Sequence, residues 1–202
     1  MSKLLTAKVL QNYADLMVNF AANERKGVQP SDIVYVKVME SGMCMLKYFQ
    51  RAILKAGAHP ILDVVIEGLA KEFYELANDE QLTFAADKMF DARINTIDHL
   101  ISMIGPKDPL AMEGVSGEKI KQRTQALSGL NKKMSRKFDS GEVSWTLALF
   151  GTEGMAKQAG MSLDEYWEQI IHACYLDSDD PVSEFRDKFD KIDQVATWLN
   201  GL

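Results

Sequence analysis

Histidine and carboxylate side chains could hold a catalytic metal, but this sequence spaces them poorly for that purpose. The chain has three histidines, His59, His99 and His172. Glu168 and His172 are four residues apart in a helical stretch and therefore share a helix face, yet no second histidine follows at ligand spacing. We expect His172 to be a structural residue and His59, which precedes Pro60, to be a turn residue.

Nucleophilic catalysis has no better support in the sequence. There is no Gly-x-Ser-x-Gly elbow. Cys44 and Cys174 both stand among apolar helix positions, and no histidine is near Cys44 in sequence. Buried, inert thiols in a reducing compartment are the simpler interpretation.

The segment Met39-Glu40-Ser41-Gly42-Met43 follows the first predicted strand, where an α/β protein would bind a nucleotide. A phosphate cradle needs several glycines so that backbone N–H groups can converge on the anion. One glycine beside a carboxylate does not provide this, so no nucleotide site is predicted. We therefore predict that this chain contains no catalytic, cofactor-binding or metal-ligating residues.

A basic face on the helix predicted over residues 118–137 could bind an anion. The preferred interpretation is a solvent-exposed face whose positive charges interact favourably with the negative, carboxyl end of the helix dipole. The residues of this face are Lys119, Lys121, Arg123, Lys132, Lys133, Arg136 and Lys137.

The stretch from Asp32 to Glu67 sets the fold class. An apolar, β-branched run at 33–38 is followed by helical spacing over 43–56 and by a second apolar run at 61–66. Strand, helix and strand in this order form a βαβ unit. Further strands are predicted at 97–104 and 143–149, and Asp98 and His99 suggest that one end of the third strand is exposed. The sequence thus predicts an α/β fold with a mainly parallel, four-stranded sheet, helices on both faces and a helical C-terminal segment.

Helices are predicted from apolar spacing at several places. Leu5 to Phe20 should cover the sheet, and Ser162 with Glu165 matches a capping box. The last helix begins at Pro181, and we expect it to pack through Phe185, Phe189 and Ile192. Further helices are predicted over 69–77, 85–95 and 118–137.

Composition describes an ordinary globular chain of 202 residues with 47% apolar and 26% charged residues. We expect a single domain over 1–202. A formal net charge of −6 argues against nucleic acid as a partner. The apolar stretches are too short for a membrane span, and Lys8 and Asp15 interrupt any signal peptide. A cytoplasmic location is expected.

Several motifs together resemble one family, the thermophilic-type metallo-aminopeptidases of the aminopeptidase T and aminopeptidase S type. The resemblance covers nearly the whole chain, as the amino-terminal domain of such an enzyme. Gly151 and Met155 depart from the pattern. The motifs are Tyr13 to Gly57 with Ala56-Gly57-Ala58, Ile97-Asp98, Thr152 to Glu165, Asp179-Asp180-Pro181-Val182 and Leu199-Asn200.

The resemblance implies removal of N-terminal residues from peptides by two divalent metal ions, such as zinc or cobalt, that activate a bridging water. It also implies that the ligands lie in a carboxy-terminal domain beginning after Leu202, so that this chain alone has no cofactor and is inactive. The full-length parent protein would then bind the peptide substrate. The resemblance leaves open whether that parent protein forms a homodimer.

A second interpretation also stays open. The chain could be a stand-alone α/β module that binds a partner or a small ligand without catalysis. A longer reading frame with Glu and His clusters after Leu202 would favour the enzyme, and a natural stop codon there would favour the module.

Overall fold

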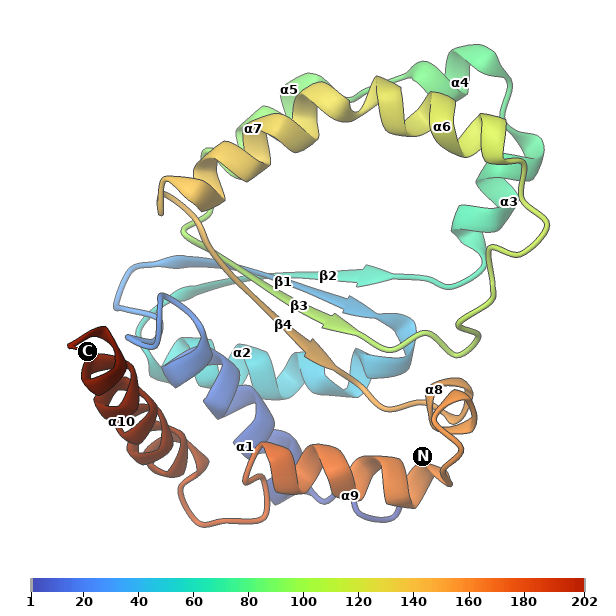
Figure 1. Cartoon of the computed structure of the whole chain (residues 1–202). Helices are drawn as coiled ribbons and strands as arrows, with labels where there is room; N and C mark the ends of the chain where they lie inside the picture. Colours follow the sequence, from blue (N-terminus) through green and yellow to red (C-terminus); the bar gives the residue numbers. More distant parts are fainter. Residues whose placement is uncertain (1, 202) are drawn as a thin grey trace.

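The computed structural model describes residues 2–201, and a parallel sheet lies at its centre (Figure 1). Its strands are β1 (Ile33–Met39), β2 (His59–Val65), β3 (His99–Ile104) and β4 (Ser144–Leu149). All pairings are parallel and the strand order is β2-β1-β3-β4. The predicted α/β class and the four predicted strands are confirmed.

One face of the sheet, here called the closed face, is covered by helices from both ends of the chain (Figure 1). The main core lies here and includes Val36, Ile101 and Met103, each at most 1% exposed. The predicted first helix is split, because its second part is a π-helix. The covering elements are α1 (Ala7–Leu16), the π-helix η1 (Met17–Ala21), α2 (Leu46–Lys55), α9 (Leu163–Ala173) and α10 (Pro181–Asn200).

The other face, here called the open face, lies beneath an arch of helices from the middle of the chain (Figure 1). The arch meets the sheet at a small second core of Tyr35, Ile97 and Val143. Beyond that core, Trp145 and Leu147 of β4 remain 58% and 49% exposed. The arch consists of α3 (Leu69–Leu76), α4 (Asp79–Thr83), α5 (Asp87–Ile94), α6 (Gly117–Ala126) and α7 (Ser128–Asp139).

Local sequence signals set several helix ends. The predicted capping box is confirmed: the Ser162 hydroxyl accepts from the Glu165 N–H, and the Glu165 carboxylate accepts from the Ser162 N–H. Asp180 caps α10, with Pro181 as its first residue. The short helix α8 (Glu153–Gln158) begins after the Thr152 cap.

Three local predictions need correction. The break expected at Glu40-Ser41-Gly42 is instead a 3₁₀ helix, η2 (Glu40–Met45), that leads into α2. The helix predicted over 118–137 divides at Leu127, before Ser128 and Gly129, which favour helix poorly.

The third correction concerns the last helix. Phe185 and Phe189 pack against the main core, but Ile192 is 48% exposed, because α10 leaves the core in its second half. No helix within residues 2–201 is both long and apolar enough to cross a bilayer.

Candidate functional site

The carboxyl ends of β1 and β3 form the point where ligands usually bind in an open α/β sheet, since the chain leaves these neighbouring strands in opposite directions. Here protein fills that position. The Ser41 hydroxyl donates to the Gly105 carbonyl, and the Gly105 N–H donates to the Met39 sulfur at 3.3 Å. A Cβ on Gly105 would lie 2.4 Å from the Phe150 carbonyl oxygen. The loop after β1 is therefore packed into the protein and does not present its N–H groups to a phosphate.

An ion-pair network lies beside this position. Lys107 Nζ is 2.8 Å from Glu40 Oε1 and 3.9 Å from Glu67 Oε2. The hydrogen bond that Lys107 donates to Glu40 lowers the pKa of the Glu40 carboxyl. The Lys107 backbone N–H also donates to Glu67. Glu40 and Glu67 thus share a single cationic partner, Lys107.

The histidines singled out by the sequence do not converge. His59 is the first residue of β2 and is exposed, and its N–H donates to the Asp32 carbonyl at 2.8 Å. His172 and Glu168 are both exposed on α9, so His172 is not the packed structural residue that the sequence suggested. Among the described residues, neither of these two side chains has a hydrogen-bond partner.

His99 is buried, at 5% exposure, whereas the sequence suggested an exposed strand end. Its Nδ1 lies 2.7 Å from Ser144 Oγ, and its Nε2 lies 2.7 Å from Asp32 Oδ2. Ser144 Oγ also accepts the Asn23 N–H at 3.0 Å. A neutral imidazole satisfies every group, because Ser144 then donates to Nδ1 and Nε2 donates to Asp32.

This Ser–His–Asp connectivity resembles that of a catalytic triad, but its position argues for a structural role. Asp32 immediately precedes β1, and His99 and Ser144 are the first residues of β3 and β4, so the group lies at the amino ends of the strands. Substrate would have no access to a ring that is buried and bonded at both nitrogens. Sequence reasoning missed the group because Asp32 and Ser144 are 67 and 45 positions from His99, and only strand pairing brings them together.

The cysteines and the basic face of α6 and α7 have structural surroundings. Cys44 and Cys174 are half-buried against the main core, and burial raises the pKa of both thiols. On α6, Lys119 donates to the Tyr74 carbonyl at 2.6 Å, and Arg123 donates to the Leu82 carbonyl at 3.3 Å. The prediction of a purely solvated basic face is therefore wrong for α6, where two cations bind the carbonyls that end α3 and α4.

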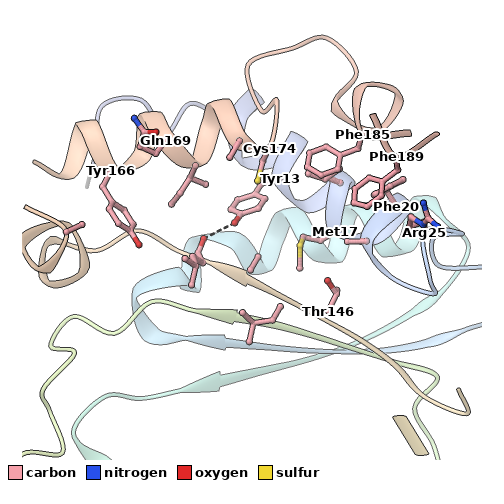
Figure 2. Close-up of a pocket in the computed structure, with 18 of the residues that line it drawn as sticks. Tyr13, Met17, Phe20, Arg25, Thr146, Tyr166, Gln169, Cys174, Phe185 and Phe189 are labelled. Carbon is pink, nitrogen blue, oxygen red and sulfur yellow. Dashed lines mark hydrogen bonds between the residues drawn. The ribbon is translucent and has the colours of Figure 1, made fainter. Parts of the chain in front are cut away.

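An apolar cavity of about 690 Å³ lies along β4 (Figure 2) and is here called the β4 groove. Four consecutive residues of β4, from Thr146 to Leu149, border it. Successive side chains of a strand point to opposite faces, so a cavity that touches all four lies along the edge of the strand. Its other walls are formed by Tyr13, Leu16, Met17, Phe20, Ala21, Arg25, Ala159, Met161, Tyr166, Gln169, Ile170, Ala173, Cys174, Phe185 and Phe189.

Aromatic rings and one bonded tyrosine shape the β4 groove (Figure 2). The Phe20 ring contacts those of Phe185 and Phe189, with centroids 5.6 and 5.5 Å apart. Tyr13 donates its hydroxyl proton to the Leu149 carbonyl at 2.9 Å. Burial raises the pKa of Tyr13, so the phenol remains protonated and keeps donating.

The charge in the groove comes from Arg25, which already has partners. Its Nη1 lies 2.9 Å from Asp193 Oδ2, and its guanidinium lies 5.2 Å from the centroid of the Phe189 ring. Volumes of about 300–1,000 Å³ with mostly apolar walls are typical of ligand sites. The groove can therefore bury apolar groups but offers no catalytic constellation.

A comparison with protein-family models settles the family. The model of the thermophilic metalloproteases (M29) matches residues 6–202. The chain belongs to this family. The resemblance to the aminopeptidase T and aminopeptidase S type is thereby confirmed, and the family description implies dependence on metal.

Individual relatives agree with this assignment. Aminopeptidase PepS of Streptococcus thermophilus is 32% identical over 100 residues, which make up 46% of this chain and 24% of PepS. The solved structure of wild-type AmpT from Thermus thermophilus superposes with a TM-score of 0.66 at 19% identity, covering 80% of this chain and 41% of AmpT. The second match confirms the fold. The chain thus spans less than half the length of either relative.

The metal that the M29 family implies does not fit the residues described. Within residues 2–201, no group of three or more His, Cys, Asp or Glu side chains is arranged to hold an ion. His99 uses both ring nitrogens for Ser144 and Asp32, so it has no lone pair to offer without losing a partner. No step of metal chemistry can be derived from these side chains.

Proposed function

We propose that this chain is the amino-terminal, non-catalytic part of a metal-dependent aminopeptidase that removes N-terminal residues from peptides in the cytoplasm. The observation that carries the proposal is the M29 match, which extends over residues 6–202. PepS and AmpT support it, since the aligned part of this chain covers only 24% and 41% of their lengths.

The metal centre, in this proposal, consists of two divalent ions held by residues beyond Leu202. Two close ions would activate a bridging water and polarise the scissile carbonyl. The dispersed histidines support this location, because His59, His99 and His172 lie on β2, β3 and α9. The role of the described residues would be to fold beside that centre and position it.

A stand-alone module that binds without catalysis is the second candidate. The β4 groove favours it, because an apolar cavity of about 690 Å³ could bind a partner in the absence of any metal. The two candidates make different predictions for the isolated chain and for a longer product of the same reading frame.

Metal retention and peptide hydrolysis test the proposal. The 202-residue chain and the product of its longest continuous reading frame are incubated with Co²⁺ or Zn²⁺ and desalted. Retained metal is measured by mass spectrometry, and amino acid release is followed with a leucyl peptide. We expect two ions per chain and turnover from the longer product, and neither from the 202-residue chain.

Two results would contradict the proposal. If the 202-residue chain retained two ions with turnover, and His172→Ala or Glu168→Ala abolished both, the active site would lie within this chain. If the reading frame ended at Leu202 and the chain remained silent, the stand-alone module would be the better description. Asp187→Ala, at an exposed position of α10 outside the groove lining, is the control.

A further inference from the structure

Strand β4 forms one outer edge of the sheet, so half of its backbone polar groups point away from the other strands. The Ser144 N–H donates to the Asp98 carbonyl at 3.0 Å, and the Phe150 N–H donates to the Ile104 carbonyl at 2.7 Å. Neighbouring residues of a strand direct these groups to opposite sides. Ser144, Thr146 and Ala148 therefore direct their N–H and C=O groups toward β3. The N–H and C=O groups of Trp145, Leu147 and Leu149 point outward.

Little in the described part of the chain uses these outward groups. The Tyr13 hydroxyl binds the Leu149 carbonyl at 2.9 Å. Within residues 2–201, the outward N–H and C=O groups of Trp145 and Leu147 have no hydrogen-bond partner from another element. The strand sequence, Ser-Trp-Thr-Leu-Ala-Leu, has neither a charge nor a proline. Charged residues and prolines normally protect an exposed edge strand from pairing with another strand.

The β4 groove runs along this same edge, as the lining from Thr146 to Leu149 shows (Figure 2). Its walls are apolar, and the guanidinium of Arg25 is held by Asp193 and Phe189. An occupant of the groove therefore meets apolar side chains on one side and backbone donors and acceptors on the other.

We propose that the β4 edge and the β4 groove bind an extended peptide with apolar side chains, which adds to the sheet as a fifth strand beside β4. An extended peptide has backbone N–H and C=O groups at the spacing that the outward groups of Trp145 and Leu147 require. Its alternate side chains would enter the groove. A helix bonds its own backbone and a lipid tail has no such groups, so neither would satisfy this edge.

The proposal does not depend on catalysis. A chain that holds no metal and cleaves nothing would still bind the peptide, so failure of binding and failure of the proposed aminopeptidase activity are distinguishable.

Binding is tested on the full 202-residue chain with a panel of acetylated, amidated heptapeptides that alternate Val or Leu with Thr. The blocked amino terminus prevents cleavage. Titration calorimetry measures affinity, and hydrogen exchange by NMR locates the contact. We expect slower exchange at the amides of Leu147 and Leu149, with no change at Thr146 and Ala148, whose amides already face β3. The same peptides with alternate amides N-methylated should bind at least about tenfold more weakly.

A variant separates backbone pairing from simple apolar contact. Leu147→Pro removes an outward N–H but leaves the bonds to β3 intact, since proline is tolerated at an edge. We expect about tenfold weaker binding with little change in the unfolding midpoint. Leu54→Ala, on the exposed surface of α2 and outside the groove lining, is the control and should bind within about twofold of the unchanged chain. If Leu147→Pro unfolds, Ala173→Glu, which places a carboxylate in the groove wall, should weaken binding instead.

Three results would overturn the proposal. One is the absence of binding by every peptide of the panel. Another is protection of Leu147 and Leu149 that depends on protein concentration without any peptide, with a dimer in sedimentation, because a second copy would then occupy the edge. The third is binding of a fatty acid in the groove that peptides cannot displace.

Discussion

The two faces of the sheet differ sharply although they are made of the same four strands. On the closed face, Val36, Ile101 and Met103 are at most 1% exposed beneath α1, α2, α9 and α10. On the open face, Ile61 is 41% exposed and Trp145 is 58% exposed under the arch of α3 to α7. Parallel sheets are normally covered on both faces. The described residues cover the open face only in part.

The comparison teaches that apolar content alone does not mark the core. Leu147 and Ile101 are both apolar residues in the interior of a strand, yet their exposures are 49% and 0%. The difference lies in which face each side chain takes and in what covers that face. The stability of the chain should therefore depend on the closed face, while the open face and the β4 edge remain available for contacts.

The largest effect is expected from the closed face. Ile101→Ala should lower the free energy of unfolding by about 2–5 kcal/mol, because it removes a fully buried side chain and leaves a cavity. Leu147→Ala, the matched change on the open face, should cost less than about 1 kcal/mol. Urea unfolding followed by circular dichroism measures both. Equal losses would show that the two faces are packed alike.

The next largest loss of stability is expected at His99, a buried polar residue on the closed face. His99→Leu should cost about 1–3 kcal/mol, because Asp32 and Ser144 lose the partner that lies 2.7 Å from each. His59→Leu, at the exposed start of β2, is the control and should leave stability nearly unchanged. If the two variants unfold at the same urea concentration, the network does not tie the strands together.

The last helix provides a comparison within one element. Phe189 is half-buried against Phe20, whereas Ile192, three residues later, is 48% exposed. Phe189→Ala should cost about 1–3 kcal/mol and Ile192→Ala less than about 0.5 kcal/mol. Thermal unfolding of the two variants tests this order. A larger loss at Ile192 would mean that the second half of α10 packs on the protein.

The smallest effect concerns pH. Burial raises the pKa of Asp15 on α1 above its ordinary value of 3.8. The folded state then binds the proton more tightly than the unfolded state, so this group favours folding at low pH and loses that contribution as pH rises through the raised pKa. Asp15→Asn should flatten the stability profile over this range and raise stability at neutral pH.

The control for Asp15 is Asp139→Asn, on the exposed surface of α7. It should leave the free energy of unfolding at neutral pH within about 0.5 kcal/mol of that of the unchanged chain. Unfolding midpoints in urea at several pH values measure both variants, and a lower midpoint for Asp15→Asn at neutral pH would contradict the stated effect of burial.

The strands and most helix ends could be predicted from sequence, because their signals are local. A continuous β-branched run predicted β1, and a mostly apolar run over 97–104 predicted β3. Ser162 with Glu165 predicted the start of α9. The prediction failed where an element extends past its packing partner. Ile192 continues the apolar spacing of α10, but spacing cannot say where the core ends.

The candidate site was not predictable from the sequence for a related reason. Tyr13, Leu149 and Phe185 belong to α1, β4 and α10, and their meeting along one edge depends on the strand order β2-β1-β3-β4. The resemblance pointed to the family, which the match over residues 6–202 confirmed. It carried no information on which strand would form the free edge.

By itself, the sequence determined the alternation of strands and helices, the caps of α9 and α10 and the family, since hydrophobic period and capping chemistry depend on residues close together in the chain. Tertiary structure alone decided that His99 would be buried between Asp32 and Ser144, that Lys119 would bind the end of α3, and that β4 would be an edge beside a groove. These are contacts across 45 to 67 positions of sequence for the histidine. Their energies depend on which elements become neighbours, a property of strand pairing and helix packing that no local pattern contains.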